Sequence, residues 1–77
     1  MINNLKKYIY DKDFKLIMTN NSLNIINYIS ITTLTDDYIE IKTNENLISI
    51  TGNNLVLNKL LNQEILIIGN IKKIEVF

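Results

Sequence analysis

Cysteine, histidine, arginine, proline and tryptophan are all absent from this 77-residue sequence. Without cysteine the chain forms no disulfide, and without cysteine or histidine it lacks the usual ligands of a structural zinc site. The missing histidine also removes the base that most often activates a serine or threonine nucleophile. We therefore expect a protein that is not an enzyme, with no catalytic residue, metal site, cofactor or small-molecule substrate.

Positive charge comes from lysine alone, and the eight lysines match the eight acidic residues, so the formal net charge is zero. Nucleic-acid binders usually carry a net basic face and use arginine to read bases or hold phosphates. A stacking platform of tyrosines would need such a face, but Tyr38 is flanked by Asp36, Asp37 and Glu40. The pattern argues against a nucleic-acid partner and favours a solvated turn at the two aspartates.

Glycine is scarce, and its two occurrences end similar segments, Ile48-Ser-Ile50-Thr-Gly52-Asn53 and Ile65-Leu-Ile67-Ile-Gly69-Asn70. Because the two glycines are isolated, the chain lacks the glycine cluster of a phosphate-binding loop. They are typical of places where a strand ends or bends. We therefore predict four structural corner residues, which are Gly52, Asn53, Gly69 and Asn70. The recurrence also leaves a short β-solenoid open as an alternative to an antiparallel fold.

Long apolar runs are missing too, since no stretch approaches the roughly 18 consecutive apolar residues of a membrane span. Met1 to Tyr10 lacks the apolar core of a secretory signal, so we expect a cytoplasmic protein. Ile2, Leu5 and Ile9 instead lie at helical spacing, which predicts a short amphipathic helix over residues 2–10. Residues 1–13 are thus expected to be a helix that caps the sheet, a frayed terminus, or a helix that binds a membrane surface or partner.

From Phe14 onward, apolar residues alternate with polar ones, which predicts a single all-β domain over residues 14–77. We expect a small antiparallel meander or roll of about six or seven short strands. The first hairpin turns at Asn20-Asn21-Ser22, and the segment from Leu23 to Thr35 is predicted as one long strand that bends or bulges near Asn27 to Ser30.

The clearest hairpin joins Tyr38–Thr43 to Leu47–Thr51, because Ile39 and Ile41 would pair with Ile48 and Ile50 across a tight polar connection. Gly52-Asn53-Asn54 is predicted as a further turn, followed by an edge strand over Leu55–Asn62. The last segment, from Ile65 to Phe77, is predicted to contain a bulge at Gly69-Asn70.

Apolar residues also occupy positions that would face away from the core of such a sheet. A domain this short buries only about 60% of its unfolded surface, so its stability is marginal and a partner or self-association would help. We predict a protein-interaction surface, with homo-oligomerisation as an alternative use of the same apolar area. Its residues are expected to be Ile17, Ile26, Tyr28, Leu34, Leu66 and Ile68.

The strands, taken in order, resemble the YabP/YqfC family of sporulation proteins, and they are most similar to its YqfC-like branch. The resemblance covers residues 14–77 and is carried by "LISITGNNLVLNKL" and by the ending "EILIIGNIKKIEVF", with Glu64, Gly69 and Glu75. Family members often show an Asn-His-Arg-Gly-like corner after the second strand, of which this chain keeps only Asn27. None of these features is a catalytic signature.

The resemblance implies a non-enzymatic protein that acts in the mother cell during endospore formation, with a membrane-associated sporulation protein as its partner. It implies a cytoplasmic location, peripheral to the membrane around the forespore. Two alternatives from other classes remain: a self-assembling structural β protein, and, less favoured, a small β-barrel that binds nucleic acid.

Overall fold

A computed structural model of the chain describes residues 14–77, and the helix predicted over residues 2–10 lies outside the described residues. The described part is all-β and contains no helix. All of its strand pairs are antiparallel, which confirms the predicted fold class. The strands are β1 (Lys15–Met18), β2 (Ser22–Ile26), β3 (Ser30–Leu34), β4 (Tyr38–Lys42), β5 (Leu47–Leu61) and β6 (Glu64–Val76).

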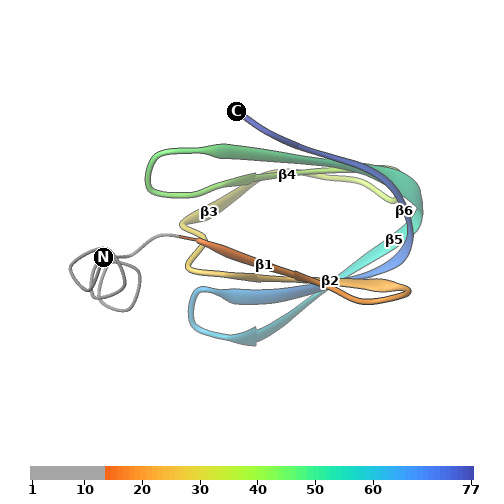
Figure 1. Ribbon diagram of the computed structural model, residues 1–77, viewed down its shortest axis with the longest axis horizontal. Coiled ribbons are helices and arrows are strands. Elements are labelled where there is room, and N and C mark those ends of the chain that lie inside the picture. The colour runs from red at the N-terminus through yellow and green to blue at the C-terminus, as the bar shows by residue number, and fades with distance from the viewer. Residues whose placement is uncertain (1–13) are drawn as a thin grey trace, which may run out of the picture.

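The six strands form one sheet in the order β1-β2-β6-β5-β4-β3, and this sheet folds over on itself. The long strands β5 and β6 pair along most of their length, but their other neighbours change midway. β4 pairs only with residues 47–51 of β5, and β2 pairs only with residues 64–68 of β6. Figure 1 shows the result as two facing layers, joined at the right where β5 and β6 curve.

We call these the β4 layer and the β2 layer. The β4 layer contains β3, β4, residues 47–53 of β5 and residues 70–76 of β6. The β2 layer contains β1, β2, residues 64–68 of β6 and residues 56–61 of β5. Each long strand therefore contributes to both layers.

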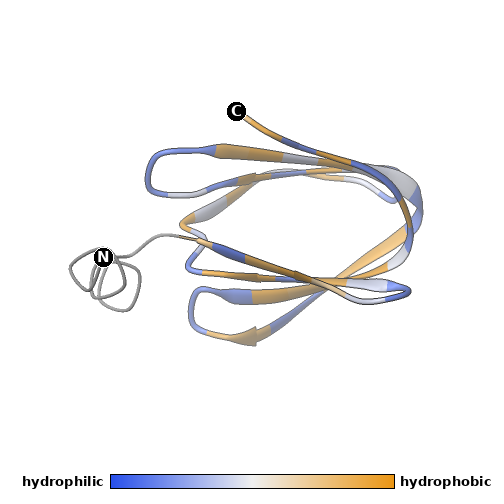
Figure 2. Ribbon diagram, viewed as in Figure 1, coloured by the Kyte–Doolittle hydropathy of each residue, from blue (hydrophilic) through white to orange (hydrophobic). Residues whose placement is uncertain are grey.

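The core lies between the layers and is formed by the inward positions of the alternating strands. In the β4 layer, Ile39 is opposite Ile50 and Ile41 is opposite Ile48, which confirms the predicted register of that hairpin. Figure 2 shows hydrophobic segments along the strands of both layers, with mostly hydrophilic connections. Within residues 14–77, ten apolar residues are buried: Leu23, Ile25, Tyr28, Ile39, Ile41, Ile48, Ile50, Leu55, Ile65 and Ile67.

The bend between the layers lies at the two glycine corners. Gly52 is opposite Ile71 and Asn53 is opposite Asn70, and the register then shifts so that the next pair is Val56 with Ile68. A bulge is present at this bend, but its extra residue is on β5, where Asn54 and Leu55 face Gly69 alone, so the prediction of a bulge at Gly69-Asn70 put it on the wrong strand. The turn predicted at Gly52-Asn53-Asn54 is wrong, because β5 continues through it as a bent strand.

Backbone groups from the neighbouring hairpin turns complete this bend. The amide of Gly52 donates to the carbonyl of Asp37 (3.0 Å), and the amide of Leu55 donates to that of Asp36 (2.7 Å). On the other strand, the amide of Gly69 donates to the carbonyl of Asn21 (3.1 Å). The turns after β1 and β3 therefore satisfy donors that the bend takes out of the β5–β6 ladder.

The two similar glycine segments are the two facing strands of a single bend. Each segment runs along one strand of the same antiparallel hairpin, so the two are similar because both lead into the bend. The solenoid alternative is wrong for the described residues, because a solenoid stacks its repeats in parallel and every strand pair here is antiparallel.

The segment from Leu23 to Thr35 is two strands, so its prediction as one bent strand is wrong. β2 ends at Ile26, and Asn27 adopts a left-handed conformation with φ of 68°. The Asn27 amide donates to the carbonyl of Gln63, in the β5–β6 turn at the end of the β2 layer, and the Ile29 amide donates to the Lys42 carbonyl of the β4 layer, each at 2.7 Å. The chain thus crosses from one layer to the other within three residues.

Candidate functional site

The two layers have outer faces of opposite character, and the apolar one is the candidate interaction site. On the outside of the β2 layer, cross-strand pairing places Ile17, Asn24, Leu66 and Asn58 in one row. The next row contains Ser22, Ile68 and Val56, and the row on the other side contains Lys15, Ile26 and Glu64. We call the apolar members of these rows the outer apolar face; they are Ile17, Ile26, Val56, Leu66 and Ile68.

Much of this apolar surface is open to solvent. Ile17 is 52% exposed, Val56 55% and Ile68 40%, while Ile26 and Leu66 are half-buried. Single exposed apolar residues are ordinary on protein surfaces, whereas neighbouring ones on one sheet face, here Val56, Leu66 and Ile68, mark a contact site. The face therefore has the character expected of a surface that another molecule covers.

Polar side chains border and interrupt the outer apolar face. Asn24 lies between Ile17 and Leu66, and its amide nitrogen donates to the Glu64 carboxylate at 3.2 Å. Lys15 lies on the same row as Glu64, with Ile26 between them. An apolar centre with a polar rim is the usual composition of a protein–protein interface.

The outer face of the β4 layer is polar and internally hydrogen-bonded. The Glu40 carboxylate accepts hydrogen bonds from the hydroxyls of Thr32 (3.1 Å), Thr33 (3.4 Å) and Tyr38 (3.3 Å). Lys73 and Glu75 form an exposed ion pair at 3.5 Å. This face is complete as a solvated surface, so it provides an internal contrast for the apolar one.

Four of the six predicted interaction residues come together on the outer apolar face: Ile17, Ile26, Leu66 and Ile68. The other two do not. Tyr28 is 5% exposed and belongs to the core, because it occupies the crossing between the layers. Leu34 is exposed, but it lies in β3, opposite Ile39, on the other layer.

Val56 belongs to the outer apolar face and is absent from the residues that the sequence predicts. The signal for it was available, because Leu55 and Leu57 on either side point inward and alternation then places Val56 outward. The turn predicted at Gly52-Asn53-Asn54 obscured the outward position of Val56, because a turn resets the phase of the alternation. Leu61, in the predicted edge strand over Leu55–Asn62, is 69% exposed, and the register shifts between Lys59 and Leu61.

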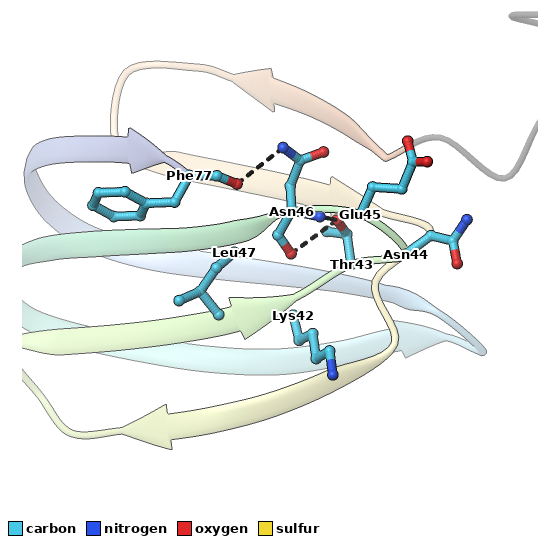
Figure 3. Close-up of a pocket in the computed structure, with 7 residues that line it drawn as sticks. All are labelled: Lys42, Thr43, Asn44, Glu45, Asn46, Leu47 and Phe77. Atoms are coloured by element: carbon cyan, nitrogen blue, oxygen red, sulfur yellow. Dashed lines mark hydrogen bonds between the residues drawn. The ribbon is translucent and has the colours of Figure 1, made fainter.

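A second candidate is the shallow depression beside the β4–β5 turn, of about 470 Å³ (Figure 3). Its polar groups bond to one another: the Thr43 hydroxyl donates to the Asn46 carbonyl (3.1 Å) and accepts from the Asn46 amide (3.0 Å). The Asn46 side chain donates to the Phe77 carbonyl at 3.0 Å. These bonds build the turn, and the side chains of Lys42, Asn44 and Glu45 point in different directions, so they do not converge on a ligand (Figure 3). Its lining residues are Lys42, Thr43, Asn44, Glu45, Asn46, Leu47 and Phe77.

The two adjacent aspartates and the tyrosines at positions 28 and 38 have structural roles. Asp36 and Asp37 form the turn between β3 and β4, where the Thr35 hydroxyl donates to the Asp37 carboxylate at 2.8 Å. Within residues 14–77, no group of three or more acidic side chains is arranged to hold a metal ion. In the same range, Tyr28 is buried and the Tyr38 hydroxyl bonds to Glu40, so these two tyrosines form no joint platform.

No helix in the described part of the chain is long and apolar enough to cross a membrane. Comparison of the sequence with protein-family models, with curated proteins and with solved structures gives no match. The candidate site therefore stands on the contrast between the two outer faces of this one sheet.

Proposed function

We propose that this chain is a protein-interaction module that docks a partner protein on its outer apolar face. The observation that carries the proposal is the difference between the two outer faces. One face is polar and hydrogen-bonded around Glu40, whereas the other exposes Ile17, Val56 and Ile68. A sheet that only needed solvation would have no reason to differ in this way.

The outer apolar face contributes part of the free energy needed for docking. Fully burying an exposed Ile or Val side chain is worth about 1.5–3 kcal/mol, so completing the burial of a half-exposed one is worth about 1 kcal/mol. The three exposed members thus supply a few kcal/mol before the half-buried Ile26 and Leu66 are counted. Because the surrounding polar rim contains Asn24 and Glu64, directional bonds can add specificity.

For the biological setting, we propose a role in endospore formation, supported by the resemblance to the YabP/YqfC family. The module would act in the cytoplasm of the mother cell and reach the membrane around the forespore through a membrane-associated partner. The family's Asn-His-Arg-Gly-like corner is replaced here by the crossing at Asn27, whose neighbour Tyr28 is buried. The outer apolar face, which lies on β1, β2, β5 and β6, is therefore the surface to which we assign the partner.

A fluorescent fusion followed in the native host through starvation tests both parts of the proposal. We expect the wild-type fusion to appear only in sporulating cells and to concentrate around the forespore. The double variant Ile17→Lys/Ile68→Lys should appear at the same time but stay diffuse, because two charges on the apolar face oppose docking. The control is Thr51→Glu, which adds a charge to the exposed polar face opposite Lys73.

The role in sporulation and the docking face are contradicted by different outcomes. Diffuse wild-type signal throughout vegetative growth would contradict the role in sporulation. Forespore localisation of the Ile17→Lys/Ile68→Lys variant equal to that of the wild type would contradict the docking face. Circular dichroism of the purified variants establishes that both keep the β-sheet, so that lost localisation reports lost docking.

A further inference from the structure

Strand edges without a neighbouring strand occur, within residues 14–77, at β1, at β3, along residues 70–76 of β6 and along residues 56–61 of β5. An open edge presents unpaired backbone N–H and C=O groups that pair readily with another strand. Natural proteins therefore shorten, bulge or charge their edges. The edges of this sheet differ sharply in how far they are protected.

Three of these edges carry such protection. β1 has only four residues, and β3 has five residues with a register shift between Ile31 and Thr33. The β6 edge carries Lys72, Lys73 and Glu75 in close succession. Each feature disfavours the addition of another strand.

The β5 edge carries one lysine, Lys59, and a register shift between Lys59 and Leu61, but it is longer than β1 and β3 and has fewer charges than the β6 edge. Among the described strands, only β4 and β6 have Cα atoms within 8 Å of those of β5, and β4 pairs with it no further than Thr51. Residues 56–61 carry one charge, that of Lys59, beside Leu60 and Leu61, which are 47% and 69% exposed. This long, nearly uncharged edge is the place where a further strand fits best.

We propose that a second copy of this chain occupies the β5 edge, so that two β5 strands pair antiparallel across a twofold axis at Asn58. In this register Asn58 lies opposite its own copy, and Val56 lies opposite Leu60 of the second copy. A register centred on Lys59 would instead place two ammonium groups directly opposite each other, which is unfavourable. The zero formal net charge of the chain also leaves no overall repulsion between copies.

Charge and symmetry favour a second copy over an unrelated strand. A twofold contact uses the same surface on both molecules, so the edge must be complementary to itself. The segment from Val56 to Leu61 meets this condition, because its single charge faces Leu57 of the other copy. An acidic partner strand would gain only the one contact to Lys59.

The dimer would place the two outer apolar faces side by side. A twofold axis perpendicular to the sheet keeps the same face of each β2 layer on the same side, so the joined layer is one continuous surface of twice the width. Val56 of each copy lies next to the seam. If the proposed docking function holds, the partner would meet a double site, and this consequence alone depends on that function.

Sedimentation equilibrium of the full chain over a range of concentrations tests the dimer. We expect a monomer–dimer equilibrium, and Leu60→Lys should raise its dissociation constant by about tenfold, because two apolar cross-strand pairs are lost. Ile17→Lys is the matched control, since it changes the outer face at β1, far from the seam in strand order, and should leave the equilibrium unchanged. A wild-type chain that stays monomeric, or a Leu60→Lys chain that dimerises like the wild type, would overturn the proposal.

Single-cysteine cross-linking tests the register without destabilising the edge. The chain has no cysteine, so Asn58→Cys carries one thiol, which should form a disulfide with its copy because Cα atoms in paired strands lie within disulfide range. Lys72→Cys, on the protected β6 edge, is the control and should cross-link far more slowly. Equal cross-linking of the two variants would contradict the assigned edge. Sedimentation of the Ile17→Lys chain tests the dimer, and localisation of the fusion tests docking. The two measurements therefore distinguish failure of this inference from failure of the docking proposal.

Discussion

A Cβ atom on Gly52 would lie 2.2 Å from the carbonyl oxygen of Asn70 on the facing strand. The relationship is nearly reciprocal, because a Cβ atom on Gly69 would lie 2.6 Å from the carbonyl oxygen of Asn54. Gly69 also has φ of 139°, which side chains of L-residues rarely allow. Each long strand thus contributes one glycine, and the backbones approach closely where the sheet folds over.

Gly52→Ala should destabilise the domain strongly, because the added methyl group overlaps backbone that the bend holds in place. We expect a loss of about 2–3 kcal/mol in the free energy of unfolding, measured by urea denaturation. The control Thr51→Ala, at an exposed neighbouring position, should change it by less than about 0.5 kcal/mol. A Gly52→Ala domain as stable as the control would show that the bend can open without cost.

Ile67→Val and Ile68→Val are adjacent substitutions that separate the core from the outer apolar face. Ile67 is fully buried and should lose about 1 kcal/mol of stability when one methylene group is removed. Ile68 points outward, so the same change there should cost less than about 0.5 kcal/mol. Thermal denaturation of the two variants in parallel measures the difference, and equal losses would contradict the assignment of inner and outer positions.

Thr43→Val should weaken the β4–β5 turn while keeping the shape of the side chain. The hydroxyl of this buried residue both donates to and accepts from the backbone of Asn46. Its loss should cost about 1 kcal/mol, measured by urea denaturation. Thr51→Val, which removes an exposed hydroxyl, is the matched control and should be neutral or slightly stabilising, since valine favours strands. The turn hydroxyl would be dispensable if both variants unfolded at the same urea concentration.

Gln63→Gly should raise the free energy of unfolding, whereas Gly52→Ala, Ile67→Val and Thr43→Val should lower it. Gln63 closes the β5–β6 turn with φ of 62°, a left-handed conformation that costs an L-residue about 1–2 kcal/mol. Part of the relief is offset by the greater freedom of glycine in the unfolded chain, so we expect a net gain of about 0.5–1 kcal/mol. Gln63→Ala keeps the strain and should show no such gain in thermal denaturation. A lower melting temperature for Gln63→Gly would contradict this account.

Local alternation predicted the parts of the fold that depend on neighbouring residues. The pairing of Ile39 and Ile41 with the following strand was predicted because a short polar connection fixes the register. The outward positions of Ile17, Ile26, Leu66 and Ile68 followed from the same period of two.

The errors arose where long-range contacts decide the local structure. The spacing around Asn27 predicts a bend, but it does not show that the chain leaves one layer for the other. Whether Gly52 ends β5 or bends it is likewise decided by distant partners, because the carbonyls of Asp36 and Asp37 receive the amides that the bend releases. Tyr28 was predicted at the surface because its burial depends on that same crossing.

The sharing of β5 and β6 between the layers has a consequence for cooperativity. Neither layer has a complete set of strands of its own, since each takes half of the same hairpin. Loss of either layer removes the hydrogen-bonding partners of half of each long strand and uncovers the isoleucines that fill the space between the layers. Populated half-folded species are therefore disfavoured, and the domain should unfold in a single all-or-none transition.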